Sequence, residues 1–239
     1  MYITEPHVNE KFKHQSLSWH SCDTRELFEE NKAANRLEPL YSDPSSIEYK
    51  FNSYGFRADE FSNIDNMVSL GCSFTMGLGI PAYQTWSNIV SKTLGLANFN
   101  LSIDGASADC CFRMAANWIP QLTPKVILYQ NPDPSRMEWF DGHNTVPHNL
   151  MSGSTNHTIL YKAWVMNEKN LTMNYLKNLY AIKYLADSIG ALFVHIPLAQ
   201  IKRLDSARDV TVDTEGHFGP KTHHAVANTV LRQLNWPKR

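Results

Sequence analysis

A serine, a histidine and a carboxylate stand at positions in this 239-residue chain where they could act together on a carbonyl carbon. Ser73 follows a short apolar run, on what reads as a tight strand-to-helix turn with an exposed hydroxyl. His217 lies just before a predicted helix, with Asp213 four residues upstream. A serine hydroxyl becomes a nucleophile when a histidine removes its proton, and a carboxylate can hold that histidine in the correct tautomer. These residue types therefore favour acyl-transfer chemistry.

A glycine loop at residues 104–107 could supply a further part of that chemistry. Its backbone N–H groups could point at the oxyanion that develops on an attacked carbonyl. Each segment taken alone also fits a simpler role: a Gly/Ser turn at residues 70–77, a helix cap at Ser107, and a local hydrogen bond between the histidine and an acid. The place of the segments in the predicted fold is what favours the chemical interpretation.

Strands and helices are predicted to alternate from residue 66 onward. Apolar runs predict strands at residues 67–70, 99–103, 126–129 and 192–196, with a candidate fifth strand at 210–212. Helices are expected at residues 82–94, 107–120, 171–189 and 219–234. This alternation predicts a parallel sheet, and ligands of such sheets bind beyond the carboxyl ends of the strands. Four loops would then converge on one edge: residues 71–75, 104–107, 131–136 and 213–217.

The order of these segments resembles the SGNH (GDSL-like) hydrolase family. That family has a serine block near the start of the domain, a glycine block after the second strand, an asparagine block after the third, and an Asp/His block before the last helix. Residues 71–75, reading GCSFT, match the first block, Gly105 matches the second, and Asp213 with His217 match the last. The resemblance covers roughly residues 50–235, and residues 52–57 are similar to a lead-in of many bacterial and phage members.

The chain departs from the family pattern at three places. Cys72 replaces the usual aspartate of the first block. The third block reads QNPD from Gln130 in place of Gly-x-Asn-Asp, and its Asn131, one position out of register, could donate its side-chain amide to the oxyanion hole. The acid of the last block stands four residues before the histidine rather than three, and Glu215 and Asp209 are the second and third choices after Asp213.

The resemblance implies a three-layer α/β/α sandwich of the flavodoxin type with about five parallel strands, and a serine esterase that cleaves a small acyl group, such as acetyl. Ser73 would be the nucleophile, His217 its base and Asp213 the acid. The oxyanion hole would comprise Ser73, Gly105 and Asn131, and Arg136 would contact the substrate. The substrate class would be an ester of a small molecule or a carbohydrate. The alternative is an impaired member of the family that serves as a carbohydrate-binding or assembly module.

The chain is expected to form one main domain at residues 63–239, with an N-terminal extension at residues 1–62 packed on it. Residues 131–170 lack periodicity and hold several Pro, His and Asn residues, so they read as an insertion. Long loops of this kind are often lids or binding loops. A surface elaboration without a role fits equally well.

Composition argues against several classes of function. The net charge is −1, from 22 basic and 23 acidic side chains, and no basic stripe is visible, so nucleic-acid binding is not expected. No apolar run approaches the roughly 18 residues of a membrane helix. The first 13 residues are polar and do not resemble a signal peptide. A cytoplasmic protein, which could be phage-encoded, with free thiols at its four cysteines is the expectation.

Neither a metal nor an organic cofactor is expected. The densest histidine cluster, His217, His223 and His224, lacks a metalloprotease spacing. Gly77-x-Gly79 lacks the third glycine of a dinucleotide-binding loop. Cys72 is expected to pack as a small apolar residue rather than to act as a nucleophile. The oligomeric state stays open.

Overall fold

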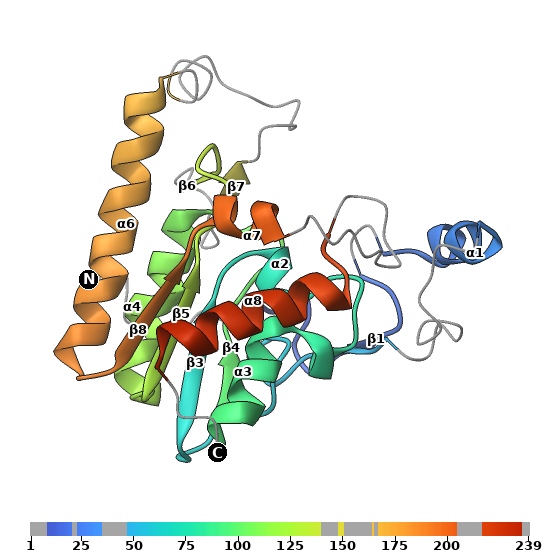
Figure 1. Cartoon of the computed structure of the whole chain (residues 1–239), viewed down its shortest axis with the longest axis horizontal. Helices are drawn as coiled ribbons and strands as arrows, with labels where there is room; N and C mark the ends of the chain where they lie inside the picture. The colour runs from blue at the N-terminus through green and yellow to red at the C-terminus, as the bar shows by residue number, and fades with distance from the viewer. Residues whose placement is uncertain are drawn as a thin grey trace.

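The computed structural model describes residues 9–20, 23–34, 47–139, 148–150, 164, 167–204 and 217–235. Its centre is a parallel four-stranded sheet with the order β4-β3-β5-β8 (Figure 1). These strands are β3 (Asn66–Leu70), β4 (Ala97–Asn100), β5 (Val126–Gln130) and β8 (Leu192–Ile196). This strand order is the flavodoxin type, so the predicted α/β fold is confirmed.

Helices cover both faces of the sheet, which gives the three predicted layers (Figure 1). One face packs against α3 (Trp86–Leu94) and α8 (Pro220–Gln233). The other face packs against α4 (Ala108–Leu122) and α6 (Glu168–Ser188). Side chains of a strand alternate between these two cores because successive residues point to opposite faces. In β5, for example, Val126 and Leu128 face α8 while Ile127 and Tyr129 face α4.

Two elements differ in detail from the sequence prediction. Residues 82–94 are not one helix: a 3-10 turn (Ala82–Gln84) precedes α3, because Thr85 is extended and its hydroxyl accepts from the Asn88 N–H at 3.3 Å as the N-cap. The strand expected at residues 99–103 ends at Asn100, whose side-chain oxygen accepts from the Ser102 N–H at 3.1 Å and turns the chain. The candidate strand at 210–212 lies outside the described residues.

Further elements complete the described part of the chain. They are β1 (Ser16–Leu17), α1 (Arg25–Ala33), β2 (Tyr49–Lys50), α2 (Ser73–Met76), β6 (Met137–Trp139), β7 (His148–Leu150) and α7 (Leu198–Leu204). Strands β1 and β2 pair antiparallel, as do β6 and β7. None of the helices in the described part of the chain is long and apolar enough to span a membrane.

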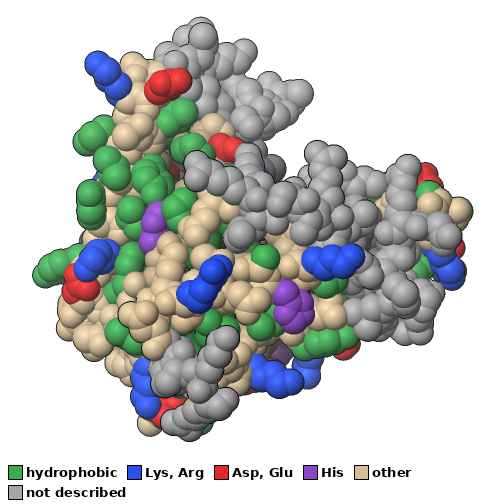
Figure 2. All heavy atoms as spheres, in the orientation of Figure 1, with side chains coloured by type: hydrophobic (Ala, Val, Ile, Leu, Met, Phe, Trp, Pro, Cys, Tyr) green, Lys and Arg blue, Asp and Glu red, His purple; other side chains and the backbone are tan. Residues whose placement is uncertain are grey.

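The outer face of α6 is unusually apolar for a surface helix. Figure 2 shows hydrophobic side chains gathered along this helix. Met173, Tyr180 and Tyr184 are each more than 60% exposed, at 65%, 64% and 72%. Large aromatic and thioether side chains normally contribute to burial, so this face is less polar than the solvent side of an ordinary amphipathic helix.

The described part of the N-terminal region packs against the loop that follows α2. Phe28, Tyr49 and Phe51 form one buried cluster with Leu78 and Ile80. The domain boundary at residue 62 stays a prediction, but these contacts make the two segments one packed unit.

A buried arginine lies at the centre of this packing. Arg57 is 5% exposed, and its guanidinium donates to the backbone carbonyls of Met76, Gly77 and Ile80 at 3.2, 2.6 and 3.0 Å. It also donates to the Glu48 carbonyl at 3.0 Å. A fixed fork of N–H donors suits such a set of carbonyls.

The positive charge of Arg57 is compensated by the Tyr49 ring and, beyond it, by the Asp23 carboxylate. The guanidinium lies 4.2 Å from the centre of the Tyr49 ring, and the Tyr49 hydroxyl donates to the buried carboxylate of Asp23 at 2.6 Å. The same hydroxyl accepts from the Gly79 N–H at 2.8 Å. Burial lowers the pKa of Arg57, and Tyr49 and Asp23 offset part of that shift. The side chain therefore joins three segments of the chain.

Replacing Arg57 with methionine should destabilise the fold strongly. Arg57→Met leaves several carbonyls without donors and the buried Asp23 carboxylate without its positive partner, which typically costs about 3–5 kcal/mol. Urea unfolding followed by circular dichroism measures this loss. Arg57→Lys keeps the charge but not the fork, so an intermediate loss is expected. Lys125→Met, which breaks an exposed pair with Asp65, should cost less than about 1 kcal/mol. Equal losses in Arg57→Met and Lys125→Met would contradict the central role of Arg57.

Candidate active site

The predicted nucleophile begins a short helix at the end of the central strand β3. Cys72 is extended and caps α2, and Ser73 is the first residue of that helix. Gly71 is required here because a Cβ atom would lie 2.2 Å from the Thr75 hydroxyl oxygen. Gly77 ends the helix with φ +82°, a conformation that favours glycine. The glycines of the motif therefore shape the turn, and Ser73 is 4% exposed.

Two side-chain amides hold this turn from the neighbouring strands. The Gln130 side-chain oxygen, at the end of β5, accepts from the Thr75 hydroxyl at 3.1 Å and from the Cys72 thiol at 3.5 Å. The Asn100 amide, at the end of β4, donates to the Thr75 carbonyl at 3.1 Å. Sequence reasoning did not assign Asn100 or Gln130. The available signal was a polar amide at the carboxyl end of an otherwise apolar strand.

Two backbone N–H groups are available at this edge. Ser73 follows β3, and Gly105, with φ +71°, follows the neighbouring strand β4. Within the described residues, neither N–H donates a hydrogen bond to another group of the chain. Available N–H groups at the ends of adjacent parallel strands are the donor type that an oxyanion hole needs.

Asn131 is engaged on the other side of β5. Its side-chain oxygen accepts from the Leu198 N–H at 3.2 Å and lies 3.1 Å from Nε2 of His195. Its amide donates to the Pro132 carbonyl at 3.1 Å. The side chain thus connects β5 to β8 and the start of α7, and its predicted role in the oxyanion hole stays a prediction.

Arg136 lies near the nucleophile turn. Its guanidinium donates to the Ala106 carbonyl at 3.5 Å, beside Gly105. Burial raises the pKa of the Cys72 thiol, and the positive charge of Arg136 offsets part of that rise. A buried thiol with a raised pKa is a poor nucleophile, which agrees with the packing role expected for Cys72.

The predicted base lies beside the helix that carries Ser73. The His217 ring meets the Phe74 ring edge-on, with 5.1 Å between the ring centres. Phe74 also packs against Phe218 at 4.6 Å, so the segment before α8 is held against α2. Asp213, together with Glu215 and Asp209, lies outside the described residues. The structure therefore brings His217 next to α2 but does not test the acid.

The other two histidines of the cluster face different surroundings. His223 is buried, and its Nδ1 accepts from the Trp86 N–H at 2.9 Å, whereas His224 is exposed. Burial lowers the pKa of His223 to about 3, and the neighbouring charge of His217 acts in the same direction. In the described ranges no group of three or more His, Cys, Asp or Glu side chains could hold a metal ion.

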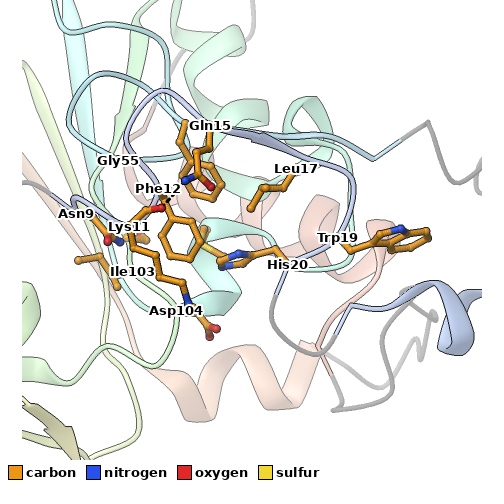
Figure 3. Close-up of a pocket in the computed structure, with 13 residues that line it drawn as sticks. Asn9, Lys11, Phe12, Gln15, Leu17, Trp19, His20, Gly55, Ile103 and Asp104 are labelled. Carbon is orange, nitrogen blue, oxygen red and sulfur yellow. Dashed lines mark hydrogen bonds between the residues drawn. The ribbon is translucent and has the colours of Figure 1, made fainter.

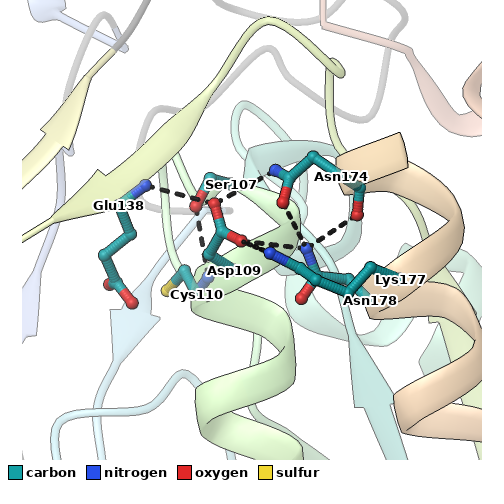
Figure 4. Close-up of polar contacts among 7 residues, drawn as sticks. All are labelled: Ser107, Asp109, Cys110, Glu138, Asn174, Lys177 and Asn178. Atoms are coloured by element: carbon teal, nitrogen blue, oxygen red, sulfur yellow. Dashed lines mark hydrogen bonds and ion pairs between the residues drawn. The ribbon is translucent and has the colours of Figure 1, made fainter. Parts of the chain in front are cut away.

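A polar network attaches the start of the predicted insertion to the domain. Glu138 in β6 forms a two-pronged ion pair with Arg113 of α4, at 2.7 and 2.8 Å. The Asp109 carboxylate accepts from the Glu138 N–H and from the amides of Asn174 and Asn178 on α6 (Figure 4). These contacts fix β6 over α4 and α6 at the carboxyl edge of the sheet. The lid role of residues 131–170 stays a prediction.

No family model and no curated protein matches the sequence. The chain is similar in structure to TesA, at 14% identity and a TM-score of 0.45, over 71% of this chain and 98% of that chain. It is also similar to a proposed lipolytic protein of the G-D-S-L family from Desulfitobacterium hafniense DCB-2, at 12% identity and a TM-score of 0.37. That match covers 71% of this chain and 99% of that chain. A third similar structure is an acetyl xylan esterase from the rumen bacterium Butyrivibrio proteoclasticus, at 12% identity and a TM-score of 0.38. That match covers 74% of this chain and 66% of that chain. At such values the similarity carries no conclusion about activity.

The buried His223 should make the protein sensitive to mild acid. Its folded pKa of about 3 lies below the ordinary value of 6.5, so the unfolded chain binds a proton that the folded chain does not. Stability should therefore fall as the pH falls below 6.5, with a contribution of up to about 1.4 kcal/mol per pH unit.

His223→Asn keeps an acceptor near the Trp86 N–H, and the stability of this variant should fall less steeply as the pH is lowered. Urea unfolding at several pH values between about 7 and 5, where most carboxylates stay ionised, measures both slopes. The exposed His224→Asn variant should keep the slope of the wild type. The same slope in the wild type and in His223→Asn would contradict the assignment.

Proposed function

We propose that this chain is a serine ester hydrolase in which Ser73 is the nucleophile and His217 the general base. The observation that carries the proposal is the junction of β3 and α2. There Ser73 stands at a glycine-shaped turn, with the His217 ring against the adjacent Phe74 and an available Gly105 N–H after the next strand. In this proposal the nucleophile, the base and the oxyanion donors come from segments far apart in sequence, and the contact of His217 with Phe74 supports their proximity.

The reaction would proceed in two steps. The Ser73 oxygen attacks the ester carbonyl carbon while His217 takes the hydroxyl proton. The tetrahedral oxyanion accepts hydrogen bonds from the Ser73 and Gly105 N–H groups, and the positive charge of Arg136 stabilises it further. The intermediate collapses, the carbon–oxygen bond to the alcohol breaks, and His217 gives its proton to the leaving alkoxide. Water then attacks the acyl-serine with the same base and releases the acid and free Ser73.

Asn131 is proposed to join the oxyanion hole with the second N–H of its amide, since the NH₂ group has two donors and the structure uses one of them. Its amide donates to the Pro132 carbonyl at 3.1 Å in the structure. The Ser73 and Gly105 N–H groups, the Asn131 amide and the charge of Arg136 together are the proposed stabilising groups. The substrate is proposed to carry a small acyl group such as acetyl on a small-molecule or carbohydrate alcohol, because a nearly buried serine admits a small acyl group most readily.

Loss of the Ser73 hydroxyl should abolish covalent labelling and turnover. A fluorophosphonate probe should label the wild type at Ser73, and Ser73→Ala should lose the label. The rate of ester hydrolysis should fall at least about 10³-fold in this variant, because removal of one member of a catalytic triad disables the others. Mass spectrometry locates the label, and p-nitrophenyl acetate reports turnover. Ser188→Ala, an exposed serine at the end of α6, serves as the control and should behave as wild type. Unchanged labelling in Ser73→Ala would refute the assignment.

The acid of the triad is proposed to be Asp213. An amide at this position favours the wrong imidazole tautomer, so Asp213→Asn should keep the fold while lowering kcat by up to roughly 10⁴-fold. The remaining activity should rise with pH as hydroxide replaces the impaired base, a profile that a purely structural defect would not produce. Glu215→Gln is the matched control and should keep most activity. Full activity in Asp213→Asn with a large loss in Glu215→Gln would reassign the acid.

A further inference from the structure

A large cavity lies between the N-terminal segment and the loop that leads to Gly105. Its volume is about 530 Å³, within the range of small-molecule sites. Residues of the N-terminal segment, among them Phe12, Trp19 and His20, form one wall (Figure 3). Met76 of α2 and Asp104 also line the cavity. Since Asp104 precedes Gly105 and Met76 lies three residues after Ser73, the cavity adjoins the proposed oxyanion site.

The N-terminal wall is built as a fixed surface. The Phe51 N–H donates to the Gln15 carbonyl at 2.8 Å, and the Asn9 N–H donates to the Tyr54 carbonyl at 2.9 Å. Gly55 has φ +78°, and a Cβ atom there would lie 2.3 Å from the Asn9 carbonyl oxygen, so the two segments approach as closely as a glycine permits. Backbone bonds to residues 51–55 therefore hold the wall in place.

Aromatic rings form the apolar part of the cavity. Phe12 stacks on Phe51 with 4.9 Å between ring centres and meets the His20 ring edge-on at 4.7 Å. Trp19 lies further along the same wall and packs against Phe28 at 5.9 Å. Flat rings of this kind contact the C–H faces of a ligand and contribute large areas at low entropic cost.

The polar groups of the cavity balance in charge. Lys11 and Asp104 lie at one end of it in Figure 3, and Gln15 adds an amide. Burial lowers the pKa of His20; the charge of Asp104 opposes that shift, and those of Arg57 and Lys11 add to it. His20 is therefore neutral at neutral pH. With one cation and one anion, the lining has no net charge that would select an anionic or a cationic ligand.

We infer that this cavity binds a sugar unit of the ester substrate, an inference that rests on the proposed hydrolase. A sugar ring has apolar C–H faces and a rim of neutral hydroxyl groups. The Phe12 and Trp19 rings fit the faces, while Lys11, Gln15 and Asp104 supply donors and acceptors for the rim. The N-terminal segment thus contributes the carbohydrate subsite, and the sheet edge contributes the chemistry.

The test compares a sugar ester with an ester that has no sugar. For wild type, Lys11→Met and Trp19→Ala, kcat/KM is measured on mono-acetylated xylobiose and on p-nitrophenyl acetate. The ratio of the two values should fall about tenfold or more in each variant, the change expected when one good contact is lost. Phe12→Leu keeps the packing on Phe51 and should lower the ratio as well. Tyr180→Ala, an exposed aromatic on α6, is the control and should keep the wild-type ratio.

A binding experiment separates the failure of this inference from the failure of the hydrolase. Titration calorimetry with unacetylated xylobiose, cellobiose and chitobiose is run on Ser73→Ala protein, alone and combined with Trp19→Ala. Binding of one disaccharide that Trp19→Ala weakens supports the subsite, even if no ester is cleaved, and that case overturns the hydrolase alone. Ester cleavage with an unchanged ratio in all pocket variants, and no disaccharide binding, overturns the subsite and leaves the hydrolase standing.

Discussion

The described architecture depends most on one buried cation. Arg57 collects the carbonyls that follow α2 and is balanced by Asp23 through Tyr49. A buried charge is tolerated only when its donors are used and its charge is compensated. The carbonyls, Tyr49 and Asp23 must therefore all be in place together around Arg57. The loop after the candidate nucleophile and the N-terminal segment therefore fold as a single unit, although 20 residues separate Arg57 from Gly77.

The parallel sheet explains why residues from distant segments meet. β3, β4 and β5 are adjacent and point the same way, so Ser73, Gly105 and Gln130 all follow or end strands at one edge. The amides of Asn100 and Gln130 then fix the turn between β3 and α2 from both sides. An isolated helix of four residues is not stable by itself, and these side-chain hydrogen bonds from the sheet stabilise it.

The sequence allowed the periodic parts of the fold to be predicted and left out contacts that depend on three-dimensional arrangement. The strand at Leu192–Ile196 and the Ser107 cap, which accepts from the Cys110 N–H at 3.1 Å, follow local patterns and are confirmed. Arg57 resembles any polar lead-in residue until its carbonyl partners are folded around it. The sequence likewise shows Gln130 only as a polar residue at the end of an apolar run. Nothing local indicates that its amide reaches Cys72 and Thr75.

The two amide side chains at the end of β5 have structural roles that bear on the proposed chemistry. Gln130 holds the turn between β3 and α2, and Asn131 connects β5 to the start of α7, so both side chains form hydrogen bonds within the domain. A glycine at position 130 would leave the Thr75 hydroxyl without the acceptor that the glutamine supplies. In the proposed mechanism the oxyanion is stabilised by backbone donors, by the Asn131 amide and by a cation. Arg136, which bonds beside Gly105 and acts electrostatically on Cys72, lies close to where such a charge would help.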